Sequence, residues 1–201
     1  MKTRIYKLND VEEAIKQASI DLGIDEEELI EKITKNEEGE TEIEITVCID
    51  PIEKGRKYIQ TILDNNNVEG IIEKSEDDKY VEYKIEAKEF NGVLIGKNSK
   101  HLIALQTLVS LIVNKYYEEN EQKVVKIDVG GYRHRKEAHL ERMAVDFGKQ
   151  VAKTKQIIKL DNLNSYERKI IHDKLSTWKD VQTHSEGQED ERVLYIEPKR
   201  K

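Results

Sequence analysis

The order of helix-like and strand-like segments over residues 51–129 constrains the fold more than any other feature of the sequence. A helix with a regular apolar stripe comes first, and two β-rich segments, 69–76 and 80–88, follow it and predict a hairpin. A short apolar stretch, a polar loop at 96–99, a long amphipathic helix and a strand at 124–129 complete the series. The predicted order is therefore α-β-β-α-α-β, a small α+β module.

The loop between the last two helices has the composition of a phosphate-binding loop. Gly96 lets another chain approach the backbone closely, Lys97 and Lys100 are cations, and the following helix begins with free N–H groups. In this order of elements, Gly96-Lys97-Asn98-Ser99 resembles the Gly-x-x-Gly loop of a type II KH domain, which clamps a nucleotide backbone. Ser99 replaces the second glycine, so we expect a left-handed residue that costs about 1–2 kcal/mol and crowds the ligand.

The first 49 residues predict a second small module, with the order β-α-α-β. A strand at 3–8 precedes a helix at 11–22, which Asn9 or Asp10 can cap. An Asp-x-x-Glu capping signature that begins at Asp25 predicts another helix, and the alternating run 41–49 predicts the closing strand.

A third module is predicted after the pair Gly130-Gly131. A helix of roughly twenty residues is followed by a strand at 156–160, a helix that Asn164 and Glu167 cap, and strands near 181–183 and 193–196. We expect a polar loop to join the last two strands, and we expect Trp178 to lie in the core.

The capped helix of the third module carries a candidate nucleic-acid site. Arg168 and His172 are four residues apart and so share one helix face, and Lys169 adds a cation. Arginine holds a phosphate with two hydrogen bonds, and histidine donates a hydrogen bond or stacks on a base. Arg133 and Arg135, after the glycine pair, are further candidates for phosphate contact.

Four stretches of the sequence, 94–97, 104–109, 128–137 and 164–172, together resemble the Jag family of SpoIIIJ-associated proteins. The resemblance runs from about residue 51 to residue 198. It is weaker before that point, because residues 35–39 stand where the family has a basic Lys-Lys-Gly-Phe segment.

This resemblance implies three domains: a Jag-N-like domain at 1–49, a KH-like domain at 50–129 and an Arg-x-x-x-His domain at 130–198. It also implies a cytoplasmic, non-enzymatic protein that binds single-stranded RNA, with single-stranded DNA as an open alternative. The implied role is that of a post-transcriptional regulator or RNA chaperone linked to cell elongation, division or envelope synthesis. The implied protein partner is a small KH-only protein.

The charge distribution leaves a second function open. The formal net charge is −7, yet residues 1–90 hold 13 basic and 25 acidic side chains, whereas residues 91–201 hold 21 basic and 16 acidic ones. The basic part coincides with both candidate sites, which favours RNA binding. The acidic part favours the alternative, an interaction scaffold for which RNA is incidental; a nuclease is the weakest interpretation.

Several other classes lack a sequence signature. No apolar run is long enough to span a membrane, and Cys48, the single cysteine, excludes an internal disulfide. His134 and His139 lack the spacing of zinc-binding helices, and the glycine motifs of dinucleotide and triphosphate sites are missing. We therefore expect no catalytic residue, no metal and no cofactor.

Overall fold

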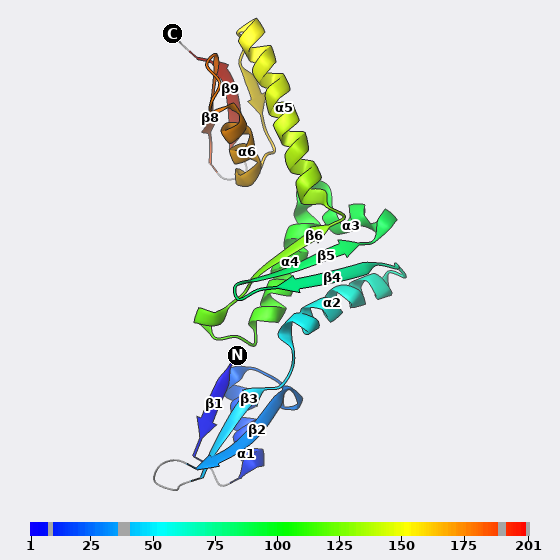
Figure 1. Ribbon diagram of the computed structural model, residues 1–201, viewed down its shortest axis with the longest axis vertical. Coiled ribbons are helices and arrows are strands. Elements are labelled where there is room, and N and C mark those ends of the chain that lie inside the picture. The colour runs from blue at the N-terminus through cyan, green and yellow to red at the C-terminus, as the bar shows by residue number, and fades with distance from the viewer. Residues whose placement is uncertain (8–9, 36–40, 189–191, 200–201) are drawn as a thin grey trace. The chain divides into compact units, whose positions relative to one another are not determined.

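The computed structural model describes residues 1–7, 10–35, 41–188 and 192–199, and it forms two compact units, Met1–Gly130 and Gly131–Lys201 (Figure 1). Within the described residues, the first unit holds two three-stranded sheets and the second unit holds one. Helices pack against each sheet, so the predicted α+β class with small modules is confirmed. The division into three domains stays a prediction.

The first sheet is made by the N-terminal module. Strand β1 (Thr3–Tyr6) and strand β2 (Leu29–Lys35) both pair antiparallel with the central strand β3 (Thr41–Val47). Helix α1 (Val11–Leu22) covers the face on which β3 presents its apolar side chains. Asp10 caps α1 by accepting a hydrogen bond of 2.9 Å from the N–H of Glu12; the alternative cap, Asn9, lies outside the described residues.

The predicted second helix of this module is wrong, because β2 occupies its place and the order is β-α-β-β. The carboxylate of Asp25 makes no capping hydrogen bond, and only a 3₁₀ turn, Glu26–Glu28, forms after it. The segment that follows is rich in β-branched residues and pairs with β3 at seven positions. Ile33, within the segment predicted as this helix, lies on β2 and is 60% exposed.

The second module of the first unit has the predicted α-β-β-α-α-β order. Helix α2 (Pro51–Asn65) precedes the hairpin of β4 (Ile71–Glu76) and β5 (Tyr80–Glu86), and the short α3 (Asn91–Ile95), the long α4 (Lys100–Asn114) and β6 (Val124–Val129) follow. The sheet order is β4-β5-β6, with β5 and β6 parallel. This is the topology that the sequence predicts for a type II KH module.

The core of this module lies between the sheet and its helices. Alternate residues of β5, namely Val81, Tyr83 and Ile85, are buried. The Tyr83 hydroxyl donates to the carbonyl of Ile52 at 2.7 Å. A side chain at Gly55 would collide with that hydroxyl, since its Cβ would lie 2.6 Å away, so a glycine is needed where α2 crosses Tyr83.

Tyr116, just after α4, ties the two modules of the first unit together. Its ring is buried in the hydrophobic core of the N-terminal module, beside residues of α1 and β3. The Tyr116 hydroxyl is 2.7 Å from Lys54 Nζ and 3.0 Å from Glu28 Oε2, and Lys54 and Glu28 form an ion pair. The Tyr116 carbonyl accepts a hydrogen bond of 2.9 Å from the N–H of Lys2.

The second unit is a three-stranded sheet with two helices on one face (Figure 1). Helix α5 (Tyr132–Thr154) and helix α6 (Ser165–Leu175) pack on a sheet of order β7-β9-β8, formed by Ile158–Leu160, Val193–Pro198 and Val181–Glu186. Trp178 is partly buried against this core, as predicted. Strand β8 is longer than expected, so His184 lies in a strand and not in the predicted loop. Residues 189–191 of that loop lie outside the described residues.

Among the residues that the structure describes, no helix combines the length and the apolar character that crossing a lipid bilayer requires.

We predict that Tyr116 stabilises the first unit without affecting the second. Tyr116→Ala should lower the free energy of unfolding of the first unit by about 3 kcal/mol, because it leaves a cavity in the N-terminal core. Tyr116→Phe keeps the ring and loses only its hydrogen bonds, which should cost about 1 kcal/mol. Urea unfolding followed by far-ultraviolet circular dichroism measures both changes.

The control for this prediction is Trp178, the single tryptophan, which reports on the second unit alone. Its fluorescence transition should keep the wild-type midpoint in both Tyr116 variants. A wild-type circular dichroism transition in Tyr116→Ala would show that the ring does not support the first unit.

Candidate nucleic-acid interface

Helix α6 begins with the capping box that the sequence predicts. The Asn164 side chain accepts from the N–H of Glu167 at 3.0 Å, and the Glu167 carboxylate accepts from the N–H of Asn164 at 2.9 Å. Two N–H groups at the helix start are satisfied in this way. The capping box therefore fixes the position at which the first turn of α6 begins.

Glu167 also joins α6 to α5. Its side chain is buried, and its carboxylate forms an ion pair with Lys136 of α5. Burial, the largest single influence, lowers the pKa of Lys136, but hydrogen bonds to Glu167 and Tyr132 outweigh it, and the net shift is upward. Lys136 therefore stays charged, and the pair anchors the start of α6 to its neighbour.

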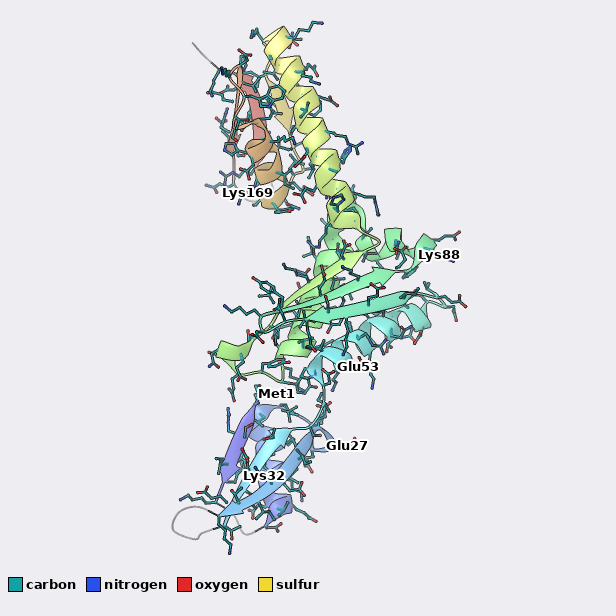
Figure 2. All side chains as sticks on the ribbon, in the orientation of Figure 1. Met1, Glu27, Lys32, Glu53, Lys88 and Lys169 are labelled. Carbon is teal, nitrogen blue, oxygen red and sulfur yellow. The ribbon has the colours of Figure 1, made fainter. Side chains whose placement is uncertain are left out.

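Burial of Glu167 sets the direction of the residues that follow it. Arg168, one position further along α6, is half-buried, while Lys169 and His172 are exposed; Lys169 is labelled in Figure 2. The Arg168 guanidinium donates to the Leu163 carbonyl and to the Ser165 hydroxyl, the latter at 3.0 Å. These two acceptors hold the guanidinium at the start of the helix.

His172 is oriented by the neighbouring strand. Its Nδ1 lies 2.5 Å from the hydroxyl oxygen of Thr183 on β8. This contact holds the imidazole ring against the β8 edge of the sheet, one helical turn after Arg168.

An open cleft of about 350 Å³ lies between α6 and β8 and brings the predicted residues of α6 together. It is lined by Ser165, Arg168, Lys169, His172, Thr183, His184, Ser185 and Arg192. Among the residues that the structure describes, the lining holds three permanent cations, two imidazoles and three hydroxyl groups, but no carboxylate. Such a set of hydrogen-bond donors is suited to a phosphate group.

A larger hollow in the first unit has the opposite character. Its volume is about 660 Å³, and its lining includes Glu118 and Glu119 with a single cation, Lys2. Two carboxylates at its edge disfavour a polyanion. We therefore assign the candidate site to the smaller cleft.

Five residues of the cleft were not found from the sequence: Ser165, Thr183, His184, Ser185 and Arg192. The three on β8 were missed because that strand was expected to end near Thr183. The alternation of Val181, Thr183 and Ser185 was the signal for a longer strand with one face toward α6. Arg192 carried no local signal, because pairing of β9 with β8 brings it to the cleft.

The structure does not bring the two predicted arginines of α5 into this cleft. Arg133 and Arg135 are exposed in the first turn of α5, and neither lines the cleft. Both residues take part in interactions within the protein. Their role in phosphate contact remains a prediction.

The second candidate site is the loop between α3 and α4, in the first unit. Gly96 has a φ of +68°, and its missing side chain leaves room for the His101 ring, whose Cγ would lie 2.5 Å from a Cβ at that position. His101 Nδ1 is 2.7 Å from the Val93 carbonyl, so the ring bridges the two helices over the glycine. Lys97, Asn98 and Lys100 are exposed around the start of α4.

Ser99 has the left-handed conformation that the sequence predicts, with a φ of +62°. The residue is only 8% exposed, however, and its side chain is therefore turned into the protein. The expectation that Ser99 crowds a ligand does not fit this orientation. The left-handed backbone at Ser99 is strained, but the buried Ser99 side chain does not project toward solvent.

Within the part of the chain that the structure describes, no group of three or more His, Cys, Asp or Glu side chains is placed to hold a metal ion. The cleft on α6 presents fixed cations and hydrogen-bond donors. Chemically, it is equipped to hold an anion.

Comparison with known proteins gives two findings. Residues 138–198 match the model of the R-three-H domain, the Arg-x-x-x-His domain. Over most of this chain, three bacterial proteins named RNA-binding protein KhpB are similar to it. The Bacillus subtilis protein is 33% identical over 95% of this chain and 96% of its own length, the Clostridium symbiosum protein 35% over 74% and 66%, and the Streptococcus pneumoniae serotype 2 protein 30% over 70% and 42%.

We predict that Glu167 supports the second unit. Glu167→Ala removes half of the capping box and leaves Lys136 without its counter-charge, which should lower the free energy of unfolding by about 2–3 kcal/mol. Glu167→Gln can still accept from the Asn164 N–H and should lose less. Urea unfolding followed by Trp178 fluorescence measures both variants.

The matched control is Glu141→Ala, which removes a carboxylate from the exposed ion pair with Lys174 in the same unit. This variant should stay within about 0.5 kcal/mol of the wild type. A loss in Glu167→Ala no larger than in Glu141→Ala would contradict the structural role of Glu167.

Proposed function

Because this chain belongs to the Jag family, whose curated members are named RNA-binding protein KhpB, we propose that it binds single-stranded RNA. The observation that carries the proposal is the cleft on α6, where the cations Arg168, Lys169 and Arg192 meet His172. The loop before α4 serves as a second site. Single-stranded DNA is the competing ligand that the binding experiments must include.

In the cleft, Arg168 holds an RNA phosphate. Its guanidinium is held by the Leu163 carbonyl and the Ser165 hydroxyl, which leaves N–H groups that those two contacts do not use. Because the guanidinium is already oriented, little side-chain entropy is lost when the phosphate binds. Lys169 and Arg192 neutralise neighbouring phosphates, and His172 adds a donor.

At the loop before α4, Lys97 and Lys100 hold a second stretch of backbone. The start of α4 presents N–H groups to the same phosphate, and the positive φ of Gly96 sets the course of the loop that leads to this helix. Apolar side chains flank the loop: Val93 on α3 and Ile103 on α4 are both about half exposed. They offer surface for the unstacked bases of a single strand.

Two weak sites on one chain gain affinity from effective concentration when a strand reaches both. We infer that the protein acts without catalysis, in the cytoplasm, as a post-transcriptional regulator or RNA chaperone. The family resemblance supports a link to cell elongation, division or envelope synthesis. Crosslinking of RNA in cells identifies the transcripts that it binds.

We predict that Arg168→Ala with His172→Ala weakens binding of an unstructured RNA by about tenfold or more. Loss of a phosphate contact also makes the negative slope of log K against log salt shallower by about 0.7. Fluorescence anisotropy at several salt concentrations measures both quantities. Lys174→Ala, which removes a cation of α6 that does not line the cleft, is the matched control.

Unchanged affinity and slope in the double variant would exclude the cleft as the RNA site. An equal loss in Lys174→Ala would show that binding responds only to net charge.

The second candidate function is a protein scaffold, and the exposed face of α4 favours it. Ala104, Leu108 and Leu111 recur along one side of this helix and are all exposed, Leu111 by 65%. The small KH-only protein that the family resemblance implies is the partner we propose for this face. The acidic side chains of the first unit give a scaffold further surface for basic partners.

We predict that Leu111→Glu abolishes association with a KH-only protein and leaves RNA binding by the α6 cleft unchanged. A charge on an apolar contact face is not compensated once the contact excludes water. Co-purification with and without nuclease measures the association. Thr107→Glu places the same charge on a polar, exposed position of α4 and is the matched control.

A complex that survives nuclease while RNA binding stays undetectable would favour the scaffold over the RNA-binding function. Retention of the partner by Leu111→Glu would exclude this face of α4.

A further inference from the structure

Three side chains form a row across the outer face of the second unit's sheet. Lys159 on β7 and His184 on β8 are both register partners of Tyr195 on β9, between them. Leu194 and Ile196, on either side of Tyr195, are buried against the helices. Since side chains alternate along a strand, the row lies on the face away from the helices.

The row is an ordered stack. The rings of His184 and Tyr195 are 5.0 Å apart between centroids and within 5° of parallel. Lys159 Nζ lies 5.3 Å from the Tyr195 centroid, within range of a cation–π interaction. Because these contacts already order both rings, neither ring has to be immobilised when a third ring stacks on them.

The stack ends at the α6 cleft. Strand β8 is at the edge of the sheet, beside β9 (Figure 1), and His184 lines the cleft together with Arg168 and Lys169. The His184 side chain is 40% exposed. His184 thus stacks on Tyr195 and also belongs to the lining of the cleft that holds the proposed phosphate site.

The surroundings of His184 suit an uncharged aromatic ligand better than a phosphate. Glu186 Oε1 lies 3.2 Å from its Nε2, and Glu197 Oε1 lies 3.4 Å from its Nδ1. Contacts to the ring nitrogens hold the imidazole by its edge and leave its face for stacking. The two carboxylates repel a phosphate at this position.

We propose that His184 and Tyr195 form a stacking platform for one base of the RNA whose phosphate Arg168 and Lys169 hold. This inference rests on the proposed RNA-binding function and adds a base subsite to it. Stacking on aromatic rings accepts every base, so the platform contributes affinity without sequence readout.

The test compares two oligomers of about twelve units, within the range of known single-strand sites: an oligouridine and an abasic chain with the same phosphates. His184→Ala and Tyr195→Leu should each weaken oligouridine binding about tenfold and leave abasic binding unchanged. The salt slope should stay at the wild-type value, because no phosphate contact is lost. His184→Phe keeps a ring and should restore most of the affinity lost in His184→Ala.

Tyr80→Leu is the matched control. Tyr80 is an exposed tyrosine on the sheet of the other unit, with Lys126 Nζ 4.6 Å from its ring centroid, and its loss should leave oligouridine affinity unchanged. Wild-type affinity in His184→Ala, or an equal loss for both oligomers, would overturn the platform while leaving the RNA-binding function intact. Absence of oligouridine binding by the wild-type chain would overturn the proposed function, and the platform with it.

Discussion

The geometry of the α6 cleft depends on the buried carboxylate of Glu167. This one group completes the capping box with Asn164 and pairs with Lys136, so it fixes both where α6 starts and how it lies against α5. The position of α6 in turn determines where the Arg168 and His172 side chains lie. A buried ion pair is weak support for overall stability, but it defines an arrangement well, since each alternative leaves a charge without a partner.

The first unit is stabilised in a different way. The described part of its N-terminal module has three short strands and one α-helix, and a core of that size excludes little surface from water. Tyr116, from the neighbouring module, fills part of this core and satisfies its hydroxyl with Lys54 and Glu28. The sequence predicts these two modules as separate folds. In the structure both depend on the Tyr116 side chain, so their stabilities are coupled.

Local chemistry explains which parts of the structure were predictable. The Asn164 and Glu167 capping box and the alternating strand Tyr80–Glu86 depend on residues close in sequence, and both were predicted. Residues 25–35 carried a helix-capping signature together with β-branched residues, and pairing with β3 decided between them. Arg192 entered the cleft through the pairing of β9 with β8, which no local pattern reveals.

Gly96 illustrates how one position can be constrained twice. Its φ of +68° is a backbone requirement, and the His101 ring over it is an independent steric requirement. A smaller residue at position 101 would remove the second restriction and leave the first. We therefore expect mutational tolerance at position 96 to depend on the residue at 101.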